Sequence, residues 1–277
     1  MQSNTAVIMS LYRGDKYAYV VEALESLYAQ THSADIFLQQ DGPIDVQIEQ
    51  MLDRALQEGK IAYLGKRAEN RGLAYSLNEL IEVVRARGYA YLVRMDADDI
   101  AIHSRIEKQV AFMEAHPRVD VVGGWIEEFN TSNGMKQVVV YQEEHHEILE
   151  ELVKRNPMAH VTVCFRNRFF DTIPSYDTTK LNEDFDLWIR ALKAGIHLHN
   201  IPEVLVNVRV SNDFYARRAS LRRAVEVMQL KIDATRQFGF GLKGYIYALA
   251  HFGLFMAPAW LKRWAYHNLR GNHETTE

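Results

Sequence analysis

The chain has 277 residues, of which 48% are hydrophobic and 25% are charged, which is the composition of an ordinary globular protein. Its single cysteine, Cys164, excludes an internal disulfide and fits a reducing compartment. The first residues, Met-Gln-Ser-Asn-Thr, lack the basic start and apolar core of a signal peptide, so we expect a cytoplasmic protein.

The formal net charge of −4 is unevenly distributed along the chain. Residues 209–270 carry 11 Lys and Arg against 3 Asp and Glu, a net charge of +8, whereas residues 1–208 carry −10. An acidic body with a basic C-terminal segment predicts that this segment meets an anionic surface. The alternative is that these charges only solvate exposed helix faces.

Hydrophobic periodicity predicts alternating strands and helices up to residue 95. We predict strands at 7–9, 36–40, 61–64 and 89–95, a turn at 10–15, and helices at 17–30, 48–58 and 73–87. Such alternation implies right-handed crossovers. The predicted fold class is therefore α/β, with a mostly parallel central sheet and flanking helices.

The pattern changes after residue 99. We predict helices at 105–115, 143–154 and 183–193, strands at 119–122, 161–166 and 198–210, and a hairpin centred on Asn133-Gly134. Asn182 is expected to cap the helix that starts at residue 183. From residue 212 onward the chain is predicted to be helical, with breaks at Gly239 and Pro258.

The strand predicted at 89–95 ends in the acidic motif Met95-Asp96-Ala97-Asp98-Asp99. Residues two apart in an extended chain point the same way, so Asp96 and Asp98 project together. Adjacent carboxylates repel unless a cation lies between them, and oxygen ligands suit Mg²⁺ or Mn²⁺. Ligands of open α/β sheets bind at the carboxyl ends of strands, so the motif predicts a metal-diphosphate site. A solvated acidic turn is the alternative, and Asp99 could cap a helix that starts near Ile102.

Further motifs accompany this one in a fixed order. They are Val7–Tyr12, Gln40-Asp41-Gly42, Glu69–Leu73 with Leu77-Asn78, Met95–Asp99 followed by Ser104–Gln109, Val121–Gly124, Asn156-Pro157 with His160–Val163, and Glu183–Trp188. Together they make residues 6–210 resemble the family-two inverting glycosyltransferases with a GT-A fold. The resemblance implies a GT-A catalytic domain at 1–210, with a nucleotide-sugar half at about 1–100 and an acceptor half at about 101–210. A basic helical arm at 211–277 would follow it.

The chain departs from the family pattern at a few positions. The family usually has Pro where Ser10 stands and Asn near Arg13, and it often has a second Asp where Gln40 stands. Many relatives carry a histidine after the position of Arg209, where this chain has Val210-Ser211. We therefore assign no third metal ligand.

The resemblance also implies substrates and roles. The donor would be a UDP-hexose, and the acceptor a saccharide on a polyprenyl-diphosphate carrier, as in O-antigen or capsule biosynthesis. The residues expected to bind the nucleotide sugar are Ser10, Tyr12, Asp41, Asn70, Arg71, Gly72, Asp96 and Ala97. Asp98 is implied as the direct ligand of Mn²⁺ or Mg²⁺, with Asp96 on the ribose and metal side, and His160 is placed near the acceptor.

Inverting transfer also needs a base that deprotonates the acceptor hydroxyl. Glu183 and Asp184 lie in the first turn of the helix predicted at 183–193, where the helix dipole favours an ionised carboxylate and neighbouring acids oppose it. The resemblance implies that Asp184 is the base and Glu183 the second choice, while Asp186 is expected on the surface. Trp188 would either contact the acceptor sugar or belong to the core.

The C-terminal arm predicts a membrane contact. Residues 244–260 contain no Asp, Glu, Lys or Arg, and residues 258–270 form an amphipathic pattern with tryptophans beside basic residues. We therefore expect peripheral attachment to the inner face of the cell membrane, or, alternatively, packing on the catalytic domain or in a homodimer. Nucleic-acid binding is not expected, because the basic residues accompany an apolar segment.

Two rival functions remain. A nucleotide-sugar-binding protein without transfer activity would share the same pocket. A sugar nucleotidyltransferase would also use paired aspartates, but it needs a glycine-rich basic loop, and residues 10–15 offer only Arg13 and Gly14.

Overall fold

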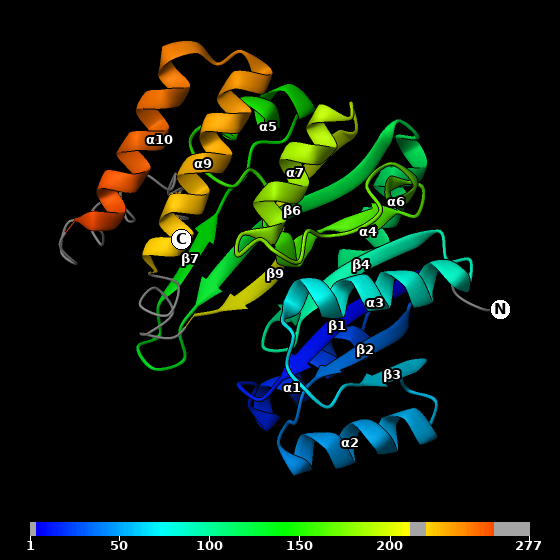
Figure 1. The fold of residues 1–277 in the computed structure, drawn as a ribbon. Helices are drawn as coiled ribbons and strands as arrows, with labels where there is room; N and C mark the ends of the chain where they lie inside the picture. The colour runs from blue at the N-terminus through cyan, green and yellow to red at the C-terminus, as the bar shows by residue number, and fades with distance from the viewer. Residues whose placement is uncertain (1–3, 211–219, 258–277) are drawn as a thin grey trace.

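The computed structural model describes residues 4–210 and 220–257, whose strands form one nine-stranded sheet in the order β3-β2-β1-β4-β8-β6-β9-β5, with β7 paired to β6 (Figure 1). The strands are β1 (Thr5–Tyr12), β2 (Asp35–Asp41), β3 (Tyr63–Lys66), β4 (Tyr91–Asp96), β5 (Ile100–Ala101), β6 (Val119–Phe129), β7 (Lys136–Val139), β8 (Cys164–Arg166) and β9 (His197–Arg209). The helices are α1 (Tyr17–Tyr28), α2 (Val46–Gln57), α3 (Leu73–Ala86), α4 (Arg105–Ala115), α5 (His145–Glu151), α6 (Phe169–Thr172), α7 (Glu183–Lys193), α9 (Leu221–Phe238) and α10 (Gly241–Met256), with a 3₁₀ turn η1 at His160–Thr162.

The first half of the sheet is parallel, and both of its faces are covered by helices. Alternate residues of β1 point to opposite faces, and all of those from Thr5 to Met9 are fully buried. Val7 and Met9 pack with residues of α1, α2 and α4, whereas Ala6 and Ile8 pack with residues of α3 and α7. An apolar run on both faces is the pattern of a central parallel strand, so the predicted α/β class is confirmed.

The second half adds antiparallel strands. β8 pairs antiparallel with β4 and β6, and β7 returns along β6 as the predicted hairpin around Asn133-Gly134. β9 runs parallel to β6 and carries β5 at its other edge. The carboxyl ends of β1, β2, β4 and β9 consequently gather the chain segments that follow them at one side of the sheet.

Some predicted local features are wrong. The turn predicted at 10–15 begins later, because β1 continues to Tyr12. The strand predicted at 161–166 starts only at Cys164, because the Thr162 hydroxyl donates to Ala159 O at 2.8 Å and accepts from Gly124 N at 3.1 Å, which holds a 3₁₀ turn instead.

Both predicted helix caps fail as well. Asp99 caps no helix, because α4 starts at Arg105, after Ser104. Asn182 occupies the N-cap position of α7, but its side chain makes no capping hydrogen bond there. It donates instead to Glu226 of α9.

The C-terminal helices α9 and α10 lie side by side at the end of the molecule away from β3 and α2 (Figure 1). The predicted break at Gly239 is confirmed, because this residue ends α9 in the left-handed conformation at φ 71°. α9 also contributes Leu230 and Ala234 to the core shared with α3 and α7. The predicted break at Pro258 and the amphipathic stretch 258–270 lie outside the described residues.

None of the helices in residues 4–210 and 220–257 is long and apolar enough to cross a bilayer.

Candidate active site

Three carboxylates cluster where β4 ends. Asp96 is the last residue of β4, and Asp98 and Asp99 lie in the turn that leads to β5. One carboxylate oxygen of each lies within 4.8 Å of the others. Arg94 precedes Asp96 by two residues, on the same side of the strand, and its Nη1 donates to Asp96 Oδ2 at 2.7 Å.

The environment of the cluster disfavours negative charge. Burial, and then the neighbouring Asp96, raise the pKa of Asp98 to about 6. Burial, and then Asp96 and Asp98, raise the pKa of Asp99 well above its ordinary value. Burial, aided by the charges of Asp98 and Asp96 and opposed by the hydrogen bond from Tyr12 N, raises the pKa of Asp15, after β1, to about 7. A set of carboxylate oxygens whose charges are only partly compensated by arginine fits Mn²⁺ or Mg²⁺, because a divalent cation would stabilise the ionised forms.

Arg209 of β9 holds the acidic turn in place. Its backbone N–H donates to Asp99 Oδ1 at 2.8 Å, and its Nε donates to the Asp98 carbonyl at 3.0 Å. Its guanidinium lies 4.0 Å from the ring centroid of Tyr19 and forms an ion pair with Glu22, both on α1. The buried Asp99 carboxylate thus holds the turn in place through Arg209. The partly exposed Asp98 is therefore the carboxylate better placed to bind a ligand.

The residues expected to bind the nucleotide lie together at the ends of β1, β2 and β3. Asp41, at the end of β2, accepts hydrogen bonds from the backbone N–H groups of Arg71 and Gly72, both at 2.8 Å. Asn70 Nδ2 donates to the Asp41 carbonyl at 3.1 Å. Both carboxylate oxygens of Asp41 thus hold the segment before α3, and Asp41 is only 3% exposed. Its position supports the loop that presents the exposed Asn70 and Arg71.

The end of β1 lies between these two groups. The register pairs Ser10 with Asp96 of β4 and Tyr12 with Asp41 of β2. Tyr12 is 41% exposed, and its ring covers Gly14, where an added Cβ would lie 2.4 Å from the ring. Ala97 is buried beneath the acidic turn. The expected nucleotide residues therefore form one continuous edge, with the acidic cluster at one end.

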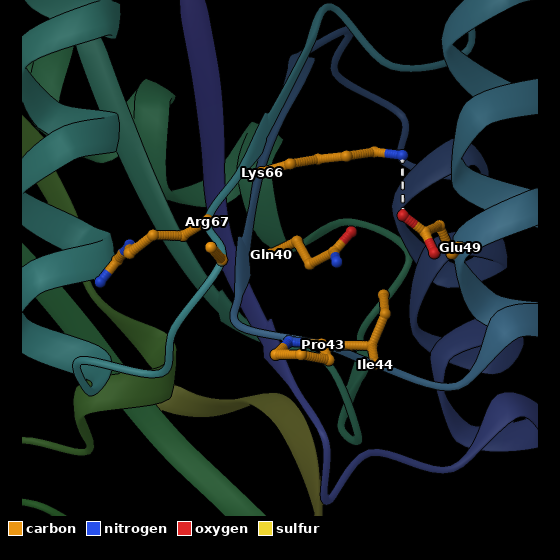
Figure 2. Close-up of a pocket in the computed structure, with 7 residues that line it drawn as sticks. Gln40, Pro43, Ile44, Glu49, Lys66 and Arg67 are labelled. Atoms are coloured by element: carbon orange, nitrogen blue, oxygen red, sulfur yellow. Dashed lines mark hydrogen bonds and ion pairs between the residues drawn. The ribbon is translucent and has the colours of Figure 1, made fainter.

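A cavity of about 360 Å³ lies next to this edge but on the other face of β2. Figure 2 shows the Gln40 amide directed into the space bordered by Lys66, Glu49 and Ile44, while the Arg67 side chain points away from it. Successive residues of a strand point to opposite faces, so Gln40 and Asp41 face different sides of the sheet. This cavity is therefore separate from the Asp41 edge.

α7 places the two carboxylates expected to act as a base. Asn156 Nδ2 donates to Asp184 Oδ2 at 2.6 Å, and the N–H of Phe185 donates to Asp184 Oδ1 at 2.8 Å. Burial, and then the charge of Asp184, raise the pKa of Glu183 to about 7, and Arg94 is close enough to oppose this shift. Arg94, which bonds Asp96, thus also acts electrostatically on Glu183, so the acidic cluster and the α7 carboxylates are neighbours.

His160 and Trp188 differ in accessibility. His160 is partly exposed, and its Nε2 lies 2.8 Å from the Tyr176 hydroxyl. Trp188 is fully buried, with its ring stacked on Phe165 at 6.1 Å and its edge facing His160. No face of Trp188 is available to a sugar in this structure, which corrects the expectation of a direct acceptor contact.

Asp186, which we expected on the surface, is also buried, and it accepts a hydrogen bond from Arg190 at 2.7 Å.

Sequence reasoning missed three residues of this site. Arg94 is a charged residue inside an apolar strand, two positions before Asp96, and this spacing could have identified it. Asp15 was assigned only to a turn, and Asn156 was noted within a motif without a role. The proximity of Asp15 to Asp98, and of Asn156 to Asp184, depends on contacts between distant parts of the chain.

Comparison with known proteins identifies the family of the chain. The family model described as glycosyl transferase family 2 matches residues 6–173, and a second, described as glycosyl transferase family group 2, matches residues 91–267. A *Haemophilus influenzae* protein named only as a glycosyltransferase is 34% identical over 90% of this chain and 91% of its own length. The amylovoran biosynthesis glycosyltransferase AmsE of *Erwinia amylovora* is 32% identical over 88% of this chain and 91% of its own length.

A third relative and two solved structures complete the comparison. The UDP-Gal:alpha-D-GlcNAc-diphosphoundecaprenol beta-1,3-galactosyltransferase of *Escherichia coli* is 29% identical over 79% of each chain. The mannosyltransferase PcManGT of *Pyrobaculum calidifontis*, solved with GDP-Man and Mn²⁺, superposes with a TM-score of 0.63 at 15% identity, over 97% of this chain and 80% of that one. *S. aureus* TarS 1-349 with UDP-GlcNAc gives 0.59 at 17% identity, over 95% and 83%.

These structures share the GT-A fold with this protein. The family model covers more than half of the chain, and two relatives exceed 30% identity over nearly its whole length. The chain is a glycosyltransferase that belongs to glycosyl transferase family 2.

Proposed function

We propose that this protein is a metal-dependent, inverting hexosyltransferase that moves a hexose from a UDP-sugar to a lipid-linked saccharide. The observation that carries the proposal is that Arg94, which bonds Asp96, also acts electrostatically on Glu183, so the acidic cluster and the α7 carboxylates are neighbours. The bond to the leaving phosphate and the bond to the acceptor oxygen are both at the anomeric carbon, so the metal site and the base must be neighbours. The rival binding protein would need only the first of them.

The donor would lie along the edge formed by Ser10, Tyr12 and the loop that Asp41 supports. Departure of UDP leaves negative charge on its phosphates, and Mn²⁺ or Mg²⁺ held by Asp98, with Asp96, would supply Lewis-acid stabilisation. Arg71 is exposed on this loop with its guanidinium 4.0 Å from the Tyr75 ring centroid, and it would approach the nucleotide from there.

Asp184 would accept the proton from the acceptor hydroxyl as that oxygen bonds to the anomeric carbon on the face opposite the leaving phosphate. Asn156 orients the Asp184 carboxylate through Oδ2. Glu183, whose pKa is raised to about 7, is the second carboxylate that could take this role. His160, with the Tyr176 hydroxyl, would line the acceptor side.

The relatives support the substrate class. The E. coli galactosyltransferase is named for UDP-Gal as donor and a GlcNAc-diphosphoundecaprenol acceptor, and another E. coli relative is named for O-antigen biosynthesis. A membrane-borne acceptor would require this protein to work at the inner face of the membrane. The exposed apolar residues Leu242, Ile246 and Leu249 of α10 support such attachment, because their spacing places them on one helix face.

The proposal is tested by incubating the purified protein with UDP-Glc, UDP-Gal, UDP-GlcNAc and UDP-GalNAc and measuring UDP release, with and without a polyprenyl-linked acceptor. We expect EDTA to abolish release and Mn²⁺ or Mg²⁺ to restore it. Asp98→Ala should lose turnover while the far-ultraviolet circular dichroism spectrum is unchanged. Full activity in EDTA would contradict the metal assignment, and donor binding without any UDP release would favour the binding protein.

A further inference from the structure

We propose that α9 is part of the catalytic centre and that Glu226 is a positioning residue for the α7 carboxylates. This inference rests on the proposed function. It differs from the expectation that the chain beyond residue 210 serves only as an arm for membrane or dimer contact. The evidence is a pair of contacts that α9 makes with the two segments next to Glu183 and Asp184, one before α7 and one before Asn156.

The first contact is made by one oxygen of Glu226. Its Oε1 accepts hydrogen bonds from Leu181 N at 2.9 Å, Asn182 N at 2.8 Å and Asn182 Nδ2 at 3.0 Å. These donors belong to the two residues that immediately precede Glu183. The backbone leading into α7 is therefore held by a side chain of α9 instead of by a cap from its own sequence. Hydrogen bonds to a charged acceptor are about twice as strong as neutral ones.

The second contact lies farther along α9. Lys231 is 1% exposed, and its Nζ donates to the Val153 carbonyl at 2.6 Å. Val153 lies three residues before Asn156, whose amide orients Asp184. Leu230, next to Lys231, packs in the core shared with α7. α9 thus holds both the backbone that carries the base and the segment that orients its carboxylate.

The placement of a base has large kinetic consequences. A displacement of about 1 Å can lower a rate about 10²-fold, because the acceptor hydroxyl and the carboxylate must meet within hydrogen-bond distance. Donor binding takes place at the β1, β2 and β4 edge and does not use Glu226. Loss of the Glu226 contacts should therefore lower kcat without weakening the binding of UDP-sugar. A residue that only stabilised the fold would not separate these two quantities.

The test compares Glu226→Ala, Glu226→Gln and, as a matched control, Asp233→Ala, which removes an exposed carboxylate from the same helix. Glutamine keeps the Oε1 acceptor and alanine removes it. For each variant, kcat is measured with saturating UDP-sugar and acceptor, the Kd of the UDP-sugar by calorimetry, and Tm by circular dichroism.

We expect Glu226→Ala to lower kcat at least about tenfold, with a Kd within about twofold of the wild type. Glu226→Gln should recover most of the loss, and Asp233→Ala should match the wild type. If Glu226→Ala does not fold, Glu226→Asp, which withdraws the acceptor by one methylene group, should show the same loss of kcat.

The inference is overturned if Glu226→Ala keeps wild-type kcat, if its Kd rises in parallel with the loss, or if glutamine is as inactive as alanine. A wild-type protein that transfers sugar, and that needs Asp184 but not Glu226, would overturn this inference and leave the proposed function intact. A wild-type protein without any transfer would overturn both.

Discussion

The aspartates at the end of β4 have different environments although they are nearly adjacent in sequence. Asp96 pairs with the buried Arg94, and Asp99 accepts the backbone N–H of Arg209. The Asp98 carboxylate is not paired in either of these ways. Burial and the charge of Asp96 raise its pKa to about 6. Because the other two carboxylates are held by the protein, Asp98 is the one that gains most from a cation.

The base is the first prediction at this scale. Asp184→Asn keeps the size of the side chain and its Oδ1 contact with the N–H of Phe185 but removes its basicity. We expect kcat to fall about 10²–10⁴-fold, the usual effect of losing a general base, while the Kd of the UDP-sugar stays nearly constant. Glu183→Gln is the comparison. An inactive Glu183→Gln beside an active Asp184→Asn would exchange the two roles.

Asp15 leads to a prediction about stability and pH. Its pKa is about 7 in the folded protein and 3.8 ordinarily, so the folded state retains a proton that the unfolded chain has released. Proton binding by Asp15 therefore stabilises the folded state fully below about pH 4, and this stabilisation is lost as the pH rises to about 7.

Asp15→Asn removes this loss while an amide oxygen can still accept from Tyr12 N. In EDTA, the free energy of unfolding of the variant minus that of the wild type should be larger at pH 8 than at pH 5 by at least about 1 kcal/mol, as measured by urea unfolding. Saturating Mn²⁺ should reduce the gain. An equal difference in stability at both pH values would contradict the raised pKa.

At the scale of elements, the candidate donor edge depends on the close approach of two loops. Gly42 follows β2 with φ of 82°, and a Cβ there would lie 2.7 Å from the backbone N of Asn70. The hydrogen bonds from Arg71 and Gly72 to Asp41 require this approach. The glycine is therefore needed both for its positive φ and for the space it leaves.

Gly42→Ala and Gly59→Ala separate these two requirements. Gly59, after α2, has φ of 70° but no atom within 4 Å of an added Cβ. We expect Gly59→Ala to cost about 1–2 kcal/mol of stability from backbone strain alone and to leave the KM of the donor unchanged. Gly42→Ala should cost more and raise that KM. Equal effects of the two substitutions on KM would mean that the contact between the loops does not shape the donor site.

At the scale of the molecule, α9 connects α10, which has an exposed apolar face, to the core of the fold. α9 packs Leu230 into the shared core, and Gly244 allows α10 to approach the Thr235 side chain of α9 closely. The outer face of α10 leaves Leu242, Ile246 and Leu249 exposed by 75%, 57% and 62%. Membrane contact through α10 would therefore lie one helix away from Glu226.

This face predicts binding to vesicles. Leu242→Ser, Ile246→Ser and Leu249→Ser, combined, should reduce co-sedimentation with anionic liposomes at least about tenfold, because each side chain loses about 1 kcal/mol or more of apolar insertion. The loss should persist at high salt, which screens the basic residues only. Val46→Ser with Leu56→Ser on α2, which are also exposed, is the control. A wild-type protein that stays in the supernatant at low and high salt would contradict membrane binding by this face.

The sequence alone determined the fold class and the strand ends that carry the chemistry. The spacing of apolar residues placed most helices and strands within a few residues, because burial on one or two faces of an element follows directly from local periodicity. The order of motifs predicted the family, which the comparisons confirm. The position of Asp96 at the end of β4, with Asp98 just beyond it, also followed from the sequence, since the apolar run that predicts the strand stops there.

Only the tertiary structure brought the rest together. Asp15 comes near Asp98, Arg94 acts on both Asp96 and Glu183, and Glu226 holds the start of α7. Local patterns also misplaced the roles of Asn182 and Asp99, whose side chains take hydrogen-bond partners from α9 and β9 instead of from the helices that follow them. Periodicity reports which face of an element is buried, but the partner of a polar side chain depends on which distant segment packs against that face.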